Sequence, residues 1–316
     1  MSESKQNLKK LNNFRYLKIE ILRVLAWLQL FLFFYAVPDI IKYFWKDFQN
    51  LFPSDNYMYA VGLILINSLT YYGGSLIFMC IYKGEFNLFE QYKIIKNKKW
   101  PWNEDQENWQ KIRNKTILNS FLNLFVVGLG LLVIDLQIND VKINFSLETF
   151  PSKLKNLKYF CILLFFHDFC FYWSHRFFHQ KFIYPYIHKI HHQYYQNVCI
   201  AGQYFHPLEF VITILLPTFL MVKYLGRDLH FSTLCMWIFV MGVNAVEEHS
   251  GYDFPWSPFN ISDYNVSAQF HDFHHSHNLG TFGAQFNFYD KLFKTDKEFK
   301  QFMKSQQVKH IDKKIS

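Results

Sequence analysis

The sequence has 316 residues, of which 51% are hydrophobic and 21% aromatic, and it carries a formal net charge of +8. Its mean hydropathy of −0.04 is near neutral, yet long apolar runs alternate with connectors rich in Lys and Asn, a block pattern that indicates membrane spans rather than one soluble core. The basic residues lie beside these runs, so the positive charge does not point to a nucleic-acid binder.

The first segment, residues 1–18, is a basic tail. It precedes an apolar run but has no small-residue cleavage site, so we expect a cytosolic tail before a retained anchor, not a signal peptide that is removed. Its basic residues are Lys5, Lys9, Lys10, Arg15 and Lys18.

Four apolar runs predict transmembrane helices at residues 19–45, 57–82, 117–138 and 157–173. A fifth stretch, 207–246, is broken by Gly226-Arg227-Asp228 and is long enough, at about 20 residues per crossing, for a hydrophobic hairpin. A shallower re-entrant hairpin fits equally well. The expected fold is an all-α integral membrane protein with about four transmembrane helices plus a hydrophobic hairpin, under a cytosolic histidine-rich helical cap.

Connector charges predict the orientation. The connector 83–116 is rich in Lys and Arg, which places it in the cytosol together with the N-terminus. Spans one and two then form a hairpin, the loop 139–156 is lumenal, and span four leads back to the cytosol. Every histidine-rich segment and the C-terminus then lie on the cytosolic side. The final residues Lys313-Lys314-Ile315-Ser316 resemble the dilysine retrieval signal of endoplasmic-reticulum membrane proteins.

The five cysteines are scattered, without a CxxC pair. Such an unspaced, odd-numbered set argues against a disulfide framework and against a zinc–thiolate site. We expect buried thiols.

Histidines carry the clearest signal. Of the fourteen, eight fall in three clusters, one with HxxxH spacing and two with HxxHH spacing, and two more lie at the ends of the predicted hairpin. On a helix these spacings project imidazoles from one face, and a metal is what keeps so many imidazoles neutral beside a bilayer. The predicted ligands are His175, His179, His188, His191, His192, His206, His249, His271, His274 and His275. The lone residues His167, His230, His277 and His310 are expected to be structural.

Ten imidazoles exceed the needs of one ion, because a zinc ion takes three or four protein ligands. Two ions with about four or five imidazoles each fit the number and leave open positions. Imidazole binds zinc, copper, iron and nickel alike, so the spacing does not select the metal.

Nearby polar residues are placed to support these ligands. Asp168 and Tyr172 share a helical face with the first pair of histidines, and an acidic residue behind a ligand can accept its second N–H and fix the tautomer. Glu247 or Glu248 lies beside His249. The predicted supporting residues are Asp168, Tyr172, Glu209, Glu248 and Asp272, each of which could instead cap a helix or pair with a lysine. No catalytic residue beyond the metal ligands is expected.

The pattern resembles the fatty acid hydroxylase and sterol desaturase superfamily, whose signature is HxxxH, HxxHH, a hydrophobic hairpin and a final HxxHH. The similarity covers residues 86–296 and extends into the sterol C-4 methyl oxidase branch through Tyr186-Ile187-His188, His206-Pro207-Leu208-Glu209 and His249-Ser250-Gly251-Tyr252-Asp253. The stretch 244–248 and Phe254-Pro255-Trp256 differ from the branch pattern.

This resemblance implies two Fe ions, O2 as co-substrate, and electrons from NAD(P)H through cytochrome b5 and its reductase. It implies a membrane di-iron monooxygenase that oxidises a sterol C-4 methyl group in the endoplasmic reticulum. After the basic tail at 1–18, the expected domains of the protein are membrane spans and a connector at 19–156, a catalytic domain at 157–296 and a cytosolic tail at 297–316.

Several other functions stay open. Within the superfamily they are C-24 dealkylation of a sterol, C-5 desaturation of a sterol, and hydroxylation of a fatty acyl group or sphingolipid. Two alternatives belong to other classes of protein. A zinc-dependent hydrolase would need the HExxH motif, which is absent. A metal transporter would place its ligands near the middle of the bilayer, whereas these histidines lie at the span ends.

Overall fold

The computed structural model describes residues 3–139 and 141–315, and within these residues there are helices and isolated bridges but no regular strand. Side chains are described at residue 17 and from 19 to 306 apart from residue 140, so the terminal Lys313 and Lys314 and the basic residues of the N-terminal tail lie outside them. The helices are α1 (Glu3–Gln49), α2 (Asp55–Ser68), α3 (Gly74–Gly84), α4 (Asn87–Glu90), α5 (Pro101–Glu104), α6 (Gln106–Phe121), α7 (Leu129–Ile138), α8 (Lys153–Phe178), α9 (Pro207–Phe210), α10 (Leu216–Leu225), α11 (Phe231–Glu248), α12 (Ala268–His277), α13 (Phe288–Phe293) and α14 (Lys297–Ile315).

Three short π-helical segments join some of these helices into longer ones. They are Leu69–Gly73 between α2 and α3, Leu122–Gly128 between α6 and α7, and Val211–Leu215 between α9 and α10. Short 3-10 helices lie at Leu147–Thr149, His188–Gln193, Cys199–Gln203 and Gly226–Asp228.

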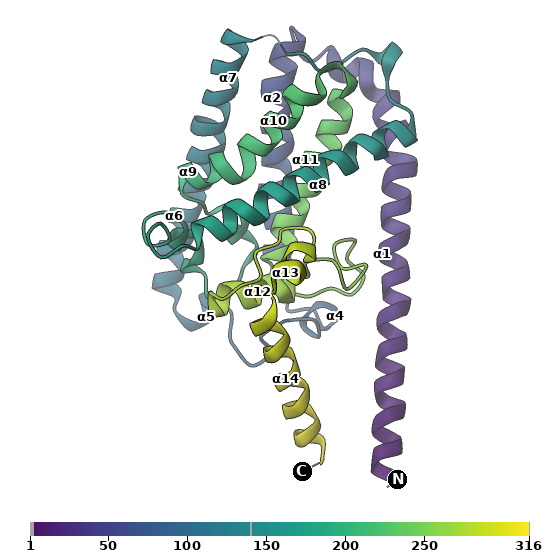
Figure 1. Ribbon diagram of the computed structural model, residues 1–316, viewed down its shortest axis with the longest axis vertical. Helices are drawn as coiled ribbons and strands as arrows, with labels where there is room; N and C mark the ends of the chain where they lie inside the picture. Colours follow the sequence, from purple (N-terminus) through teal and green to yellow (C-terminus); the bar gives the residue numbers. More distant parts are fainter. Residues whose placement is uncertain (1–2, 140, 316) are drawn as a thin grey trace.

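Four of the resulting helices are long and apolar enough to cross a membrane: Ile19–Gln49, Asp55–Gly84, Gln106–Ile138 and Pro207–Asp228. The first three contain the first three predicted spans. The fourth is not the predicted span 157–173, which lies in α8, where His167 and Asp168 interrupt the apolar run. It is Pro207–Asp228, which corresponds to the first arm of the predicted hairpin. In Figure 1, α8 crosses the bundle obliquely, and it packs against α1, α10 and α11.

The fold places the histidine-rich segments toward one end of the bundle. Figure 1 shows α12, α13 and α14 on the side of the molecule that also holds both termini, whereas the loop before α8 lies at the opposite end. The predicted hairpin forms as α10 and α11 joined at Gly226–Asp228, so the backbone leaves the histidine end and returns to it. The predicted meeting of these segments at one end is therefore confirmed.

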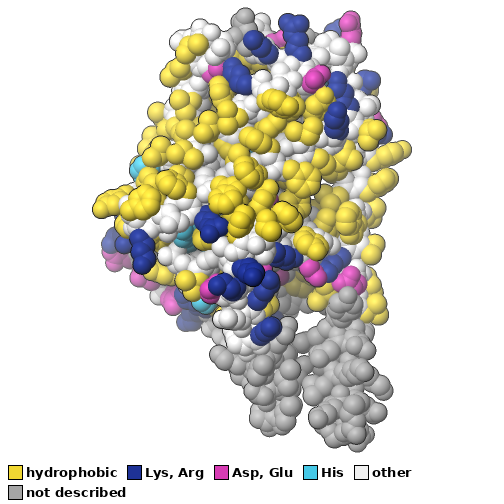
Figure 2. Space-filling model, in the orientation of Figure 1, with side chains coloured by type: hydrophobic (Ala, Val, Ile, Leu, Met, Phe, Trp, Pro, Cys, Tyr) yellow, Lys and Arg dark blue, Asp and Glu magenta, His cyan; other side chains and the backbone are white. Residues whose placement is uncertain are grey.

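The outer surface of the spans is apolar. Along α1 the side chains of Trp27, Phe31 and Tyr35 are all more than half exposed, and Figure 2 shows hydrophobic side chains in a broad band with Lys and Arg along its lower border. A contiguous surface of this size is what a bilayer covers. The protein is thus a multi-pass membrane protein.

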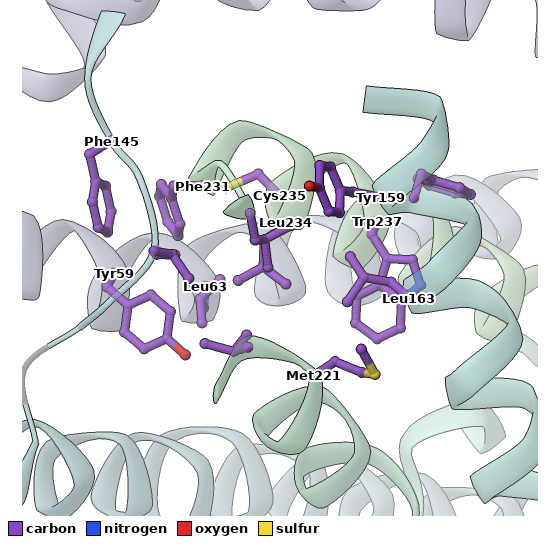
Figure 3. Close-up of a cluster of buried hydrophobic side chains, with 14 of the residues drawn as sticks. Tyr59, Leu63, Phe145, Tyr159, Leu163, Met221, Phe231, Leu234, Cys235 and Trp237 are labelled. Carbon is purple, nitrogen blue, oxygen red and sulfur yellow. The ribbon is translucent and has the colours of Figure 1, made fainter. Parts of the chain in front are cut away.

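Helix α11 is the central element of the bundle core. Its residues Phe231, Leu234 and Trp237 are buried against Tyr59 of α2 and Leu163 of α8 (Figure 3). Because one end of α11 is fixed in this core, the other end, where Glu248 and His249 lie, has a defined position.

A second, aromatic core fixes the connector between the second and third long helices. Trp100 is buried between Tyr82 and Tyr252, with ring centroids 4.6 and 5.4 Å away, and the Lys93 ammonium lies 4.1 Å from the centre of its ring. The Tyr82 hydroxyl donates to the carbonyl of Ser250, 2.7 Å away, next to His249. This core holds the histidine end of α11 from the other side.

Candidate metal centre

Nine of the ten predicted ligands gather in two groups. In each group, one nitrogen of every imidazole lies within 4.8 Å of the corresponding nitrogens of the others. The five-histidine group contains His175, His179, His188, His192 and His274. The four-histidine group contains His191, His249, His271 and His275.

The two HxxHH clusters are divided between the groups. In the second cluster His188 and His192 enter the five-histidine group and His191 enters the other, and in the third cluster His274 separates from His271 and His275 in the same way. The third cluster lies on the α-helix α12, as its spacing predicts, whereas the second cluster is a 3-10 helix. Both clusters therefore connect the two groups covalently.

Ring tautomers are set by acceptors behind the imidazoles. The Nδ1–H of His175 donates to the carbonyl of Phe282 at 3.0 Å, and that of His274 donates to the carbonyl of Gly280 at 2.6 Å. In the four-histidine group, the Nδ1–H of His249 donates to the carbonyl of Ala245 at 2.8 Å. A carbonyl only accepts, so in each case Nε2 is left unprotonated.

These unprotonated nitrogens face one another. The Nε2 atoms of His175 and His188 are 3.1 Å apart, and those of His271 and His249 are 2.9 Å apart. Lone pairs at this distance repel unless a cation lies between them. Metal–nitrogen bonds of about 2.1 Å put ligands at right angles about 3.0 Å apart, so the donor sets fit a metal ion.

Burial keeps the imidazoles neutral, as metal ligation requires. It lowers the pKa of His175 and His249 to about 4 and lowers the pKa of His275 and His188 well below the usual 6.5. The physical cause in each case is loss of hydration, with a smaller contribution from neighbouring imidazoles at His188 and His275.

Each group has one buried carboxylate behind it. Glu209 Oε1 lies 2.5 Å from Nδ1 of His188 in the five-histidine group. Glu248 Oε1 lies 3.2 Å from Nδ1 of His271 in the four-histidine group, and the Asn244 amide donates to the other oxygen of Glu248 at 3.2 Å. These two predicted supporting residues therefore lie where a carboxylate orients a ligand.

The other three predicted supporting residues contact backbone or polar side groups instead of imidazoles. Asp168 accepts hydrogen bonds from the N–H groups of Gln285 at 2.7 Å and Phe286 at 3.2 Å. The hydroxyl of Tyr172 lies 3.2 Å from that of Thr295. Asp272 is buried on α12 next to His271, and loss of hydration raises its pKa to about 7. Asp168 and Tyr172 lie on α8 as predicted, but the segments that pack against them take their hydrogen bonds.

His206 is the predicted ligand that the structure leaves outside both groups. Pro207 begins α9 directly after His206. The His206 imidazole caps that helix, because its Nδ1 accepts a hydrogen bond from the N–H of Leu208 at 3.2 Å. That nitrogen is thus used locally.

Asp290 is a supporting residue that the spacing of the histidines did not identify. It is fully buried and accepts from the N–H groups of Phe282 and Gly283, both at 2.8 Å. Since the carbonyl of Phe282 accepts from His175, Asp290 positions a ligand through the backbone. The only sequence signal was its place within residues 86–296, the stretch that resembles the superfamily.

An apolar cavity of about 520 Å³ extends from the four-histidine group into the bundle. His191, His249 and His271 line its inner end, and Asp135 and Ile138 at the end of α7 line its outer end. None of the five-histidine group lines it. Its volume is within the range for small-molecule sites.

Fold and site together define a multi-pass membrane protein with two buried groups of imidazoles, one of which lines the inner end of an apolar cavity. A sequence model of the family described as "Fatty acid hydroxylase" matches residues 160–295. The protein is 32% identical to the C-4 methylsterol oxidase erg25 of Schizosaccharomyces pombe, over 84% of its own length and 85% of that relative. It is 30% identical to methylsterol monooxygenase 1-1 of Arabidopsis thaliana, over 85% of its own length and 88% of that relative.

Other relatives have a different reaction in their names. The very-long-chain aldehyde decarbonylase GL1-11 of Oryza sativa is 28% identical, over 81% of the present sequence and 92% of that relative. No solved structure matches the sequence. The protein belongs to the fatty acid hydroxylase family and is an oxidoreductase, and the family together with its histidine groups indicates an iron-dependent oxygenase.

Proposed function

We propose that the protein is a di-iron monooxygenase that oxidises a C-4 methyl group of a sterol, using O2 and electrons from NAD(P)H delivered through cytochrome b5. The observation that carries this proposal is the pair of imidazole groups at the inner end of an apolar cavity. The names of the two methylsterol relatives support the substrate.

Nine histidines would hold the two irons. His175, His179, His188, His192 and His274 would hold one, and His191, His249, His271 and His275 the other. The bound metal supplies activation of O2 and oxidation of an unactivated C–H bond. Four or five imidazoles leave a position on each ion for a non-protein ligand.

The residues of the protein orient and shield this centre. Glu209 bonds the ring of His188, Glu248 lies 3.2 Å from that of His271, and three backbone carbonyls accept from other ligand rings. These contacts would orient the unprotonated nitrogens toward the metal ions. Gly202 allows close approach of the neighbouring turn, because a Cβ there would lie 2.6 Å from the Ala245 carbonyl that fixes His249. The buried apolar wall excludes water from the inner end of the cavity.

A sterol fits the cavity by chemistry as well as size. The wall between α2, α7, α10 and α11 is formed mainly by Leu, Ile and Phe side chains. Because the cavity lies among the apolar spans, we infer that a greasy substrate reaches it from the bilayer between these helices.

The catalytic part would comprise residues 157–296, with the histidine end and both termini in the cytosol. The Lys-rich connector at that end offers a positive surface to an acidic electron donor such as cytochrome b5. The membrane would be that of the endoplasmic reticulum, as the resemblance to sterol-oxidising enzymes implies.

Metal analysis and product analysis test this function. Protein purified in detergent with added iron should contain about two irons per molecule, and with reductant it should convert a 4,4-dimethylsterol to a C-4 oxidised product. A single zinc per molecule and no O2 consumption would overturn the oxygenase assignment. Oxidation confined to the sterol side chain, to a fatty acyl group or to a long-chain aldehyde would overturn the proposed regiochemistry.

A further inference from the structure

The nine gathered imidazoles differ in how close they lie to the surface of the protein. Eight of them are buried, whereas His179 of the five-histidine group is only half-buried. No member of this group lines the apolar cavity, so the exposed part of His179 faces the outside of the protein. The five-histidine group therefore reaches the surface on a side that the lipid cavity does not use.

Tyr184 lies over this side of the group. Its half-buried ring has its centroid 5.4 Å from that of His179. The N–H of Tyr184 donates to the carbonyl of Gln180 at 2.9 Å, and the carbonyl of Tyr184 accepts from the N–H of Lys189 at 3.0 Å. These bonds fold residues 180–189 into a compact turn beside the imidazoles.

The chain around this turn is positively charged. Residues 169–208 contain no Asp or Glu but three basic side chains, which are Arg176, Lys181 and Lys189, and residues 273–289 contain no Asp or Glu either. The guanidinium of Arg176 turns toward α13, whereas Lys181 and Lys189 are exposed. The ion pairs among the described side chains involve neither lysine. Both charges are therefore available to a partner that carries carboxylates.

Electrons must reach the metal centre in the proposed reaction. Oxidation of a C–H bond by O2 to an alcohol consumes two electrons and two protons, because the second oxygen atom leaves as water. Under the proposed function these electrons originate from NAD(P)H and arrive one at a time from a carrier protein. Electron transfer slows steeply with distance, so the carrier should dock where the metal centre lies closest to the surface.

We propose that Lys181, Tyr184 and Lys189, which border the exposed edge of His179, form the docking surface for an acidic one-electron carrier protein. This inference rests on the proposed function, since it assigns the route of the electrons that this function requires. The carrier would contact the five-histidine side while the lipid occupies the cavity beside the four-histidine group. Reductant and substrate would then approach the centre from different sides, and neither would block the other.

Binding of a carrier probe tests this surface. Full-length, iron-loaded protein in phosphatidylcholine nanodiscs is titrated with the soluble haem domain of a cytochrome b5, an acidic one-electron carrier. Reversal of both charges in K181E/K189E should weaken binding about tenfold at low salt, because like charges then face each other. The difference should shrink at about 0.5 M salt, since ions screen exposed charges. Neutralisation in K181Q/K189Q should give a smaller loss, roughly threefold.

A matched charge reversal on the connector separates contact from net charge. Lys96 and Lys99 are exposed, and K96E/K99E changes the charge of the protein by the same amount as K181E/K189E. Its affinity for the probe should fall less than about threefold, since these two lysines would lie outside the contact and act only at long range. Circular dichroism of each variant checks that it folds.

The outcomes separate the two proposals. The docking surface is overturned if the unsubstituted protein does not bind the probe, or if K96E/K99E weakens binding as much as K181E/K189E. Unchanged affinity in K181E/K189E also overturns it and would mean that these lysines face lipid headgroups. Each of these results can occur while a sterol is still oxidised at C-4. A selective loss in K181E/K189E, from a protein that forms no C-4 product, upholds the docking surface and overturns the proposed function.

Discussion

The five-histidine and four-histidine groups use the same ligand chemistry but have different surroundings. Each contains unprotonated imidazole nitrogens that face one another and one buried carboxylate behind a ring. Only the four-histidine group lines the apolar cavity, through His191, His249 and His271. Under the proposed function, the four-histidine group would therefore lie next to the substrate, whereas the five-histidine group would lie behind it and out of contact with the cavity.

The largest expected effect comes from removing one ligand from each group. H249A and H179A should each lower the iron content from about two to about one per molecule and reduce turnover at least about 100-fold. Iron analysis and sterol turnover provide the measurements. If H179A alone empties both sites, the groups are not separable and the comparison between them fails.

The carboxylates should show a smaller and unequal effect. E248Q and E209Q keep the side-group shape but weaken the contact to His271 and to His188, which should lower iron affinity or activity by about 10- to 100-fold. The loss of turnover should be greater for E248Q, because its group borders the cavity. E247Q is the matched control, since Glu247 is the neighbour of Glu248 but is not within ion-pair distance of any described imidazole. Equal losses in all three variants would contradict this assignment.

Narrowing the cavity should alter sterol binding without altering the metal. Met241 lines the cavity about two turns before Glu248 in α11, so M241W should raise the KM for sterol roughly tenfold while iron content is retained. F239W is the control, since Phe239 is 46% exposed and lies outside the cavity. Unchanged sterol kinetics in M241W would show that the substrate reaches the irons by another route.

The outer end of the cavity should tolerate change best. Lys223 of α10 pairs with Asp135 of α7 at 2.9 Å, with side chains 32% and 14% exposed. A partly hydrated pair of this kind contributes less than about 1 kcal/mol, so D135N and K223M should each change the thermal midpoint only slightly and turnover less than about twofold. A tenfold loss in either variant would mean that the far end also contacts the reacting part of the lipid.

Much of this arrangement follows from sequence patterns. Apolar runs and Lys-rich connectors predicted the helical membrane fold, three of the four long helices, and the hairpin that returns His249 to the histidine end. Spacing identified eight of the nine gathered imidazoles, and the position of His249 at the end of the predicted hairpin identified the ninth. Glu209 and Glu248 were expected beside single histidines, and both carboxylates lie close to an imidazole.

The remaining features depend on tertiary packing. Nothing in the HxxHH spacing shows that the second cluster is a 3-10 helix, or that each cluster divides between two groups, because both depend on how α8, α11 and α12 converge. The carboxylate of Asp168 was expected to accept a hydrogen bond from an imidazole. It accepts hydrogen bonds from the backbone N–H groups of residues 285 and 286 instead. His206 was predicted to bind the metal, but it lies outside both groups and its Nδ1 caps α9.

The π-helical segments suggest how such a protein diversifies. A π turn accommodates one extra residue within a helix, and such turns often occur near functional sites. Leu122–Gly128 and Val211–Leu215 both contribute to the cavity wall, through Leu124 and Ile214 among others, but neither contains a histidine. Insertion or loss of a single residue in these turns during evolution would therefore reshape the lipid pocket while the ligand spacing stayed unchanged. Related enzymes could then acquire new substrates by small length changes in their membrane helices, with the metal centre inherited intact.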